Sequence, residues 1–346
     1  MSQDVFFANG TTALAAALAA VGCHDRLVAV PAAVCPSVPA AVLASGNRPY
    51  LVDIESGTLG LCPDRLDAIG DKIGAVIAVH AYGNPCRMDD IATVARRHGV
   101  PVIEDCAQAE GAEQGGVPVG TIGDVAVFSY GAGKILDIGG GGRAVAGDAA
   151  LGQALADYAH ALTCDGDEQA ADDLSYLYKV FYNRFFPDRM ESYQFILPRV
   201  LADAGTRQLG RAKGGLEGRV AHARRGLAVE VRARRAKAQR YRARLEGRTD
   251  VELLPQPANA APWRFNMLLP VARRDDVLKT FLREGRPVSS WYPDLGLFVG
   301  DAFPRTPTPV AGRVGAGIFN LWLDGATDDD AIDDACDALC RLLDAL

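Results

Sequence analysis

The chain lacks the cysteine spacing typical of zinc sites and the long apolar runs of membrane proteins. Its eight cysteines include no CxxC pair, so we expect no metal site. No run of 18 apolar residues occurs, and the N-terminus carries no basic-then-apolar signal segment. We therefore expect no membrane association and a cytoplasmic protein whose cysteines stay reduced.

The chain also lacks an excess of positive charge. It has 36 Lys and Arg residues against 43 Asp and Glu residues, which gives a net charge of -7. Nucleic acids and anionic membranes attract basic surfaces, so we expect neither as a partner. Basic residues cluster between Arg207 and Arg248, and acidic residues between Asp324 and Asp344. We interpret the basic cluster as the solvated face of a helix rather than a binding patch.

Short apolar runs alternate with helical patterns over the first part of the chain. The expected strands are Leu27–Pro31, Pro49–Val52, Gly74–Val79, Val100–Ile103 and Val125–Ser129. The expected helices are Thr12–Val21, Ser37–Ser45, Pro63–Ile69 and Met88–His98. This alternation predicts an α/β fold with a mostly parallel central sheet and helices on both faces. Ligands of such sheets bind at the carboxyl ends of the strands.

The pattern changes in the second half. The stretch from Asp173 to Leu209 is irregular and rich in aromatic residues, and one long helix is expected over roughly Leu216 to Leu245. Strands are then expected at Trp263–Pro270 and Pro287–Tyr292, and helices at Arg274–Glu284 and Asp328–Leu346. We predict a large domain of residues 1–235 and a smaller C-terminal α+β domain of residues 236–346.

Two early motifs are candidates for holding a ligand. Gly10, Thr11 and Thr12 open the first expected helix, where backbone N–H groups, hydroxyls and the helix dipole suit a phosphate. Thr is also an ordinary helix N-cap, so the motif alone is weak. Glu104 and Asp105 end an apolar strand, where a carboxylate could hold a protonated pyridine nitrogen. The two acids could equally cap the next helix.

A third motif presents a lysine. The strand that ends at Ser129 is followed by Tyr130-Gly131-Ala132-Gly133-Lys134. A lysine in a tight turn after a buried strand can act as a nucleophile toward a carbonyl carbon, and the alternative is a surface-loop lysine. The glycine run from Gly139 to Gly142 gives backbone freedom but matches neither a Walker loop nor GxGxxG.

In this order and spacing, the motifs resemble the DegT/StrS family of sugar aminotransferases, which depend on pyridoxal 5'-phosphate (PLP) and have fold type I. The resemblance includes the stretches Val79–Pro85 and Gly111–Gly120. It implies a homodimer with active sites at the interface. Its small-molecule substrates would be an amino donor and a keto acceptor.

The resemblance also implies roles for individual residues. Lys134 matches the lysine that binds PLP as a Schiff base and transfers protons. Asp105 matches the partner of the pyridine nitrogen, Gln108 the residue near the ring 3-hydroxyl, and Ala107 the residue packed on one ring face. The phosphate contacts match Gly10, Thr11, Thr12 and Ser129.

The sequence departs from the family at several positions. Cys35 stands where the family has an aromatic residue stacked on the cofactor, and Gln194 where it has the asparagine that reaches the partner's phosphate. Only nine residues precede Gly10, which puts the acceptor pocket in doubt.

In the tail, the resemblance puts Trp291-Tyr292 near the substrate. We interpret Trp263 as packing and Arg264 as part of a surface ion pair.

We therefore expect a PLP-dependent aminotransferase that moves an amino group from glutamate or glutamine to a keto acceptor. The acceptor is expected to be a nucleotide-linked keto sugar or a related biosynthetic intermediate. One alternative is a PLP enzyme that eliminates, substitutes or cyclises an amino acid. The other is a non-catalytic regulatory scaffold. The joint presence of Asp105, Gln108, Ser129 and Lys134 argues against the scaffold, which would need none of them.

Overall fold

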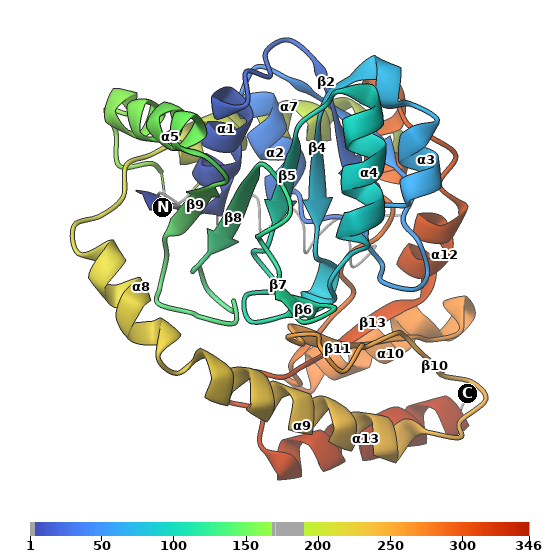
Figure 1. Cartoon of the computed structure of the whole chain (residues 1–346). Coiled ribbons are helices and arrows are strands. Elements are labelled where there is room, and N and C mark those ends of the chain that lie inside the picture. Colours follow the sequence, from blue (N-terminus) through green and yellow to red (C-terminus); the bar gives the residue numbers. More distant parts are fainter. Residues whose placement is uncertain (1–3, 168–169, 171–189, 346) are drawn as a thin grey trace.

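A computed structural model describes residues 4–167, 170 and 190–345. Its centre is a seven-stranded sheet with the strand order β1-β9-β8-β5-β4-β2-β3 (Figure 1). The strands are β1 (Asp4–Phe7), β2 (Leu27–Pro31), β3 (Arg48–Val52), β4 (Ile73–Val79), β5 (Val102–Asp105), β8 (Val125–Ser129) and β9 (Gly142–Ala146). Strands β3, β2, β4, β5 and β8 are mutually parallel, and β9 is antiparallel to both of its neighbours. The predicted mostly parallel α/β sheet is confirmed.

Helices cover both faces of this sheet, and its strands are therefore buried on both sides. Val28 and Val30 of β2 join a core with α1 (Gly10–Ala20) and α2 (Ser37–Ala44). Ala29, which lies between them, joins a separate core with α3 (Pro63–Asp67) and α4 (Met88–His98). Side chains two apart share a face of a strand, so the apolar runs feed both layers.

Further helices pack on the side of the sheet that α1 and α2 cover. Helix α5 (Ala149–Ala161) packs against α1, and α7 (Met190–Gln208) packs against α2. Among the described residues, no helix is both long and apolar enough to cross a membrane.

The C-terminal part forms an antiparallel sheet of order β10-β11-β13-β12, which confirms the predicted smaller α+β unit. Its strands are β10 (Glu252–Leu253), β11 (Arg264–Leu268), β12 (Val288–Ser289) and β13 (Ile318–Trp322). Helices α9 (Leu227–Leu245), α10 (Val271–Arg283) and α13 (Asp329–Asp344) share a core with it. Figure 1 shows α9 and α13 side by side below the large sheet. The predicted boundary between residues 235 and 236 falls inside α9 and stays a prediction.

Short elements complete the chain. They are the hairpin of β6 (Glu113–Gln114) and β7 (Val117–Pro118), the helices α8 (Leu216–Arg224), α11 (Gly296–Val299) and α12 (Pro309–Gly317), and the 3-10 turns η1 (Gly70–Lys72), η2 (Ala81–Gly83) and η4 (Gly300–Ala302).

Two predictions for the middle of the chain are wrong. The helix expected over Leu216–Leu245 is divided into α8 and α9 at Arg225 and Gly226. The stretch expected to be irregular contains the 19-residue helix α7, which tolerates Pro198 in its interior. The part of that stretch before Met190 lies outside the described residues.

One junction joins the two sheets beside the carboxyl end of β4. The backbone N–H groups of Ala261 and Trp263 donate to the carbonyls of Gly83 and Tyr82, at 3.0 and 2.9 Å. A Cβ on Gly83 would lie 1.8 Å from the carbonyl oxygen of Ala261, and the φ of Gly83 is +88°. Only glycine fits this approach, which brings the segment leading into β11 against the large sheet.

Candidate active site

A cavity of about 310 Å³ opens at the carboxyl ends of β4, β5 and β8. This is the edge of the sheet where ligands of parallel α/β folds bind. Eight of the ten predicted site residues line it: Gly10, Thr11, Cys35, Asp105, Ala107, Gln108, Ser129 and Lys134. Residues from four separate parts of the first half of the chain are thus brought together. The exceptions are Thr12 and Gln194.

The lysine lies in a tight turn directly after β8. The Lys134 N–H donates to the carbonyl of Gly131 at 3.1 Å, and Gly133 within the turn has a φ of +74°. The indole N–H of Trp263 donates to the carbonyl of Gly133 at 2.7 Å, which ties the turn to the segment leading into β11. The Lys134 Nζ atom lies 5.7 Å from the centre of the Trp263 ring. The amine is therefore half-buried over an aromatic surface rather than solvated in a surface loop.

Asp105 ends β5 with its carboxylate almost wholly buried, at 4% exposure. One carboxylate oxygen accepts the N–H of Ala107 at 2.9 Å, and no other described residue donates to it. Burial raises the pKa of Asp105, and the charges of Lys134 and His80 partly oppose that rise. A buried carboxylate with so few donors suits a cationic ligand group, such as a protonated ring nitrogen.

The start of α1 and the end of β8 form a cradle for an anion. A Cβ on Gly10 would lie 3.1 Å from the hydroxyl oxygen of Ser129, so glycine keeps this space open. The Thr11 hydroxyl donates to the side-chain carbonyl of Gln208 at 3.0 Å. Gln208 also lines the cavity, and it comes from the end of α7. Backbone N–H groups and the positive end of the α1 dipole favour a phosphate here.

Thr12 lies behind this cradle instead of lining it. Its backbone N–H donates to the side chain of Asn9 at 2.8 Å, and its hydroxyl donates to the carbonyl of Gln208 at 3.0 Å. Its side chain is fully buried. Thr12 therefore fixes the start of α1 against the end of α7, and a direct phosphate contact would require these bonds to break.

Gln194 lies away from the cavity, on α7. Its amide donates to the carbonyl of Leu297 at 3.0 Å, which ties α7 to α11. The predicted contact of Gln194 with a partner subunit's cofactor concerns an assembly and stays a prediction.

The cavity also has an aromatic wall from the C-terminal part of the chain. Trp263, Trp291 and Tyr292 line it, and the Trp263 ring stacks on the other two with centroids 5.9 and 6.4 Å apart. Gln108 is held between the two sheets, because its carbonyl accepts the N–H of Tyr82 and its amide donates to the Tyr292 hydroxyl, both at 2.8 Å. The expectation for Trp291-Tyr292 agrees with this position. Trp263 does pack, as expected, but it also forms the surface beside Lys134.

Arg264 does not form the expected surface ion pair. It is 2% exposed, and its guanidinium lies between the rings of Trp263 and Trp322, 4.3 and 4.4 Å from their centres. Its Nη1 donates to the carbonyl of Trp263, while its Nε has no partner among the described residues. Burial, together with the charge of Arg234, lowers the pKa of Arg264 to about 10. The sequence pattern failed here because Arg264 is the first residue of an entirely buried strand.

Beside Asp105, His80, Glu104 and Cys106 bring potential metal-binding atoms within 4.8 Å of one another. Hydrogen bonds already occupy this cluster. His80 Nε2 is 3.1 Å from Glu104, and His80 Nδ1 accepts the N–H of Cys86 at 3.0 Å. Glu104 accepts the N–H groups of Gly120, Ile122 and Gly123. Although burial opposes it, these contacts hold the pKa of Glu104 below its usual value. The cluster supports the end of β5.

The geometry agrees with the comparison with known sequences. The sequence model of the DegT/DnrJ/EryC1/StrS aminotransferase family matches residues 3–340. The chain belongs to this family. The predicted family resemblance is thus confirmed, and with it the expectation of PLP as the cofactor.

Individual relatives are similar to a part of the chain. It is 40% identical over 151 residues to an L-glutamine:2-deoxy-scyllo-inosose aminotransferase of Streptoalloteichus tenebrarius, covering 43% of this chain and 35% of the relative. It is 42% identical over 144 residues to an L-glutamine:scyllo-inosose aminotransferase of Streptomyces griseus, covering 41% and 34%. The matches thus span about a third of the length of these curated relatives.

The fold extends over the whole chain. The crystal structure of a DegT DnrJ EryC1 StrS aminotransferase from Brucella abortus superposes with a TM-score of 0.76 at 21% identity. The superposition covers 98% of this chain and 85% of that one. It confirms the predicted fold type I architecture.

The residues of the cavity fit PLP. The space beside Gly10, which a Cβ would fill, accommodates a phosphate oxygen next to Ser129 and Thr11. Asp105 offers a buried carboxylate to which no cationic side chain among the described residues donates a hydrogen bond, and Lys134 offers the amine. Lys134, Asp105 and three of the four predicted phosphate contacts, Gly10, Thr11 and Ser129, thus line one cavity.

Proposed function

We propose that the chain is a PLP-dependent aminotransferase that moves an amino group from glutamate or glutamine to a keto acceptor. The acceptor is a nucleotide-linked keto sugar or a related biosynthetic intermediate. The observation that carries this proposal is the single cavity shared by the Lys134 amine, the buried Asp105 carboxylate and the Thr11–Ser129 cradle. Family membership supports the reaction class. The names of two similar proteins, both glutamine:inosose aminotransferases, support the donor and a cyclic keto acceptor.

The proposed roles follow from the contacts. Thr11, Ser129 and the backbone at Gly10 would hold the phosphate at the start of α1. Asp105 would pair with the ring nitrogen, and the second amide hydrogen of Gln108 remains for the ring's 3-hydroxyl. When bound, PLP supplies an electron sink for the bonds at the amino acid's α-carbon.

The protein's own part in the reaction is proton transfer and orientation. The Lys134 amine removes the proton from the donor's α-carbon and later returns a proton to the product, acting first as base and then as acid. Asp105 keeps a proton on the ring nitrogen by pairing with its positive charge. Trp263 fixes the Lys134 turn through Gly133 and covers the amine, which limits its contact with water.

The acceptor would approach past Cys35 and Trp291, which also line the cavity. A cysteine in place of a stacking aromatic leaves more room on that side. We also propose a homodimer, in which Gln194 reaches the partner's site. The boundary of the two domains near residue 235 and a cytoplasmic location complete the proposal.

Cofactor attachment gives the first test. The purified chain mixed with PLP should absorb visible light, and borohydride reduction should attach the pyridoxyl group permanently to Lys134, as peptide mass spectrometry would detect. Lys134→Ala should lose both signals. Lys279→Ala, which alters an exposed lysine of α10, should keep them. Attachment to another lysine, or undiminished turnover by Lys134→Ala, would refute the assignment.

Donor turnover gives the second test. Glutamate or glutamine added alone should bleach the visible band and release the corresponding keto acid in one equivalent per site. A band that persists with both donors, while another amino acid is consumed by elimination, would replace the proposal by the elimination alternative.

A further inference from the structure

A buried arginine lies behind one wall of the cavity. Val127 and Ser129 of β8 line the cavity, so Phe128 between them points to the other face of the sheet. Arg143 of β9 pairs with Phe128 in the sheet, and its guanidinium lies over the Phe128 ring, 4.3 Å from the centre. The Arg143 side chain is almost wholly buried. A positive charge is thus buried against the back of the strand that carries Ser129.

The buried partner of this charge is Glu110, which follows β5 in the turn that carries Gln108. One Glu110 carboxylate oxygen lies 3.7 Å from the Nη2 atom of Arg143. Because β8 lies between β5 and β9, this ion pair reaches across one whole strand. The Nη1 atom of Arg143 donates to the carboxylate of Asp4 in β1 at 2.9 Å. The pair therefore links the Gln108 turn to β9 behind β8.

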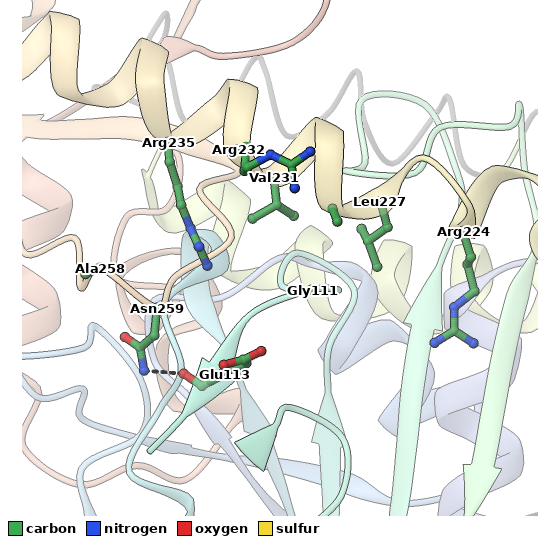
Figure 2. Close-up of a pocket in the computed structure, with 10 residues that line it drawn as sticks. Gly111, Glu113, Arg224, Leu227, Val231, Arg232, Arg235, Ala258 and Asn259 are labelled. Atoms are coloured by element: carbon green, nitrogen blue, oxygen red, sulfur yellow. Dashed lines mark hydrogen bonds between the residues drawn. The ribbon is translucent and has the colours of Figure 1, made fainter. Parts of the chain in front are cut away.

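A second arginine reaches the same carboxylate from outside the sheet. Arg224 ends α8, and its Nε atom lies 3.1 Å from a Glu110 oxygen. Figure 2 shows Arg224 extending toward the strands of the large sheet, apart from Arg232 and Arg235 on α9. Burial raises the pKa of Glu110, and the charges of Arg143 and Arg224 oppose that rise. The Glu110 carboxylate is thus the point where the two arginines meet.

Both ends of the pair adjoin the wall of the cavity. Glu110 lies two positions after Gln108, which lines the cavity at the end of β5. Arg143 directly follows Gly142, and a Cβ on Gly142 would lie 2.8 Å from the nitrogen of Gly10. Gln108 lies at the proposed ring end of the cavity, and Gly10 lies at the proposed phosphate end. A shift of Glu110 relative to Arg143 would therefore change the spacing between these two ends.

We propose that Glu110 is a positioning residue for the cofactor site. By holding Arg143 across β8, its carboxylate fixes the Gln108 turn at a set distance from the Gly10 cradle. Glu110 is not among the residues that line the cavity, so it acts through its neighbours and not by contact with PLP. The inference rests on the proposed function, because it concerns the place where PLP binds. Residues of packed networks can change ligand affinity by about 2- to 30-fold without touching the ligand.

The test compares a single and a double substitution by PLP titration and thermal unfolding. Glu110→Gln keeps the shape of the side chain but deprives the buried Arg143 of this carboxylate. It should weaken PLP binding about tenfold and lower the melting temperature of the cofactor-free protein. Adding Arg143→Met removes the buried charge and keeps an apolar side chain over Phe128, so the melting temperature should recover. PLP binding should stay about tenfold weaker, because Gln and Met do not attract each other across β8.

The absorption spectrum gives a readout that a loss of stability alone would not change. The pH at which the visible band of bound PLP changes should shift in both variants, because the proposed position of Gln108 is beside the ring's 3-hydroxyl. Glu252→Gln is the matched control, since it removes the carboxylate of an exposed ion pair with Arg313. This control should alter neither the PLP affinity nor the spectrum.

The double variant decides the question even if the single one is too unstable to titrate. Recovery of both stability and PLP affinity in the double variant would show that Glu110 only keeps a buried charge paired, and would overturn the proposal. Unchanged affinity in Glu110→Gln would overturn it too, and so would an equal loss in Glu252→Gln, since affinity would then follow net charge. These outcomes leave the proposed function intact. A wild-type chain that never takes up PLP would refute that function, and this inference with it.

Discussion

Replacing Gly142 by alanine should damage the cofactor cradle although Gly142 does not itself line the cavity. Gly142 is the first residue of β9, and it pairs with Phe7 of β1 and Ser129 of β8. A Cβ on Gly142 would lie 2.2 Å from the carbonyl oxygen of Asn9 and 2.8 Å from the nitrogen of Gly10. Both obstacles are backbone atoms, so no side chain can turn away.

The size of the effect follows from this overlap. Ordinary contact begins near 3.4 Å, so the Asn9–Gly10 backbone must retreat by about 1.2 Å from β9. Overpacking of this kind costs about 1–3 kcal/mol. If the start of α1 gives way, that cost weakens PLP binding by about 5- to 150-fold. If β9 gives way instead, the same cost appears as a lower melting temperature.

The assay is a PLP titration of the cofactor-free protein, followed by visible absorption, together with thermal unfolding. Gly312→Ala is the matched control, because no heavy atom lies within 4 Å of the added methyl in α12. This control should bind PLP as the wild type does. Wild-type affinity and wild-type thermal stability in Gly142→Ala would refute the claim that this close approach positions the cradle.

Three other substitutions test the groups around the cavity. Burial raises the folded-state pKa of Asp105 above its unfolded value, so ionisation of this side chain at neutral pH lowers the stability of the cofactor-free protein. Asp105→Asn should therefore raise the melting temperature of the cofactor-free protein at pH 7, by an amount that shrinks as the pH falls toward 3.8. The same substitution should abolish turnover. Trp263→Phe removes the 2.7 Å bond to Gly133, so it should lower the melting temperature by about 1–2 °C and slow turnover because the Lys134 turn loosens. Arg264→Met replaces a buried cation that pairs with no carboxylate in the described part of the chain, so calorimetry should find an unchanged or higher melting temperature; a fall of several degrees would contradict this reasoning.

The sequence predicts the half of the site that is built from strand ends. Asp105 and Lys134 each follow a short apolar run, and parallel strands bring such ends to one edge of a sheet. The bounds of β2, β8 and α4 agree with the predicted ranges residue for residue, because clear apolar periodicity and Gly or Pro punctuation mark them. The local sequence pattern is enough to predict the bounds of elements that pack mainly against their neighbours in the sequence.

The other half depends on contacts between distant segments, which leave no local pattern. Gln208 looks like any polar residue at a helix end, yet it completes the cradle from α7. Trp263 and Arg264 have amphipathic or polar side chains at the start of β11, whose complete burial depends on the docking of the two sheets. Strand β1 has only four residues and gains its place by pairing with β9. Periodicity cannot detect such short or late-formed partners.

The Thr11–Gln208 contact has a consequence for synthesis on the ribosome. The two side chains are separated by 197 positions, so the first helix of the nascent chain emerges long before its cradle can close. Contacts of such sequence separation form slowly, because a large loop must be ordered before they contribute. We therefore expect the cofactor to contribute little to the early stages of folding. A nascent chain halted before residue 208 would display Lys134 yet lack the Thr11–Gln208 contact, so we expect the cavity to be completed late in the maturation of this protein.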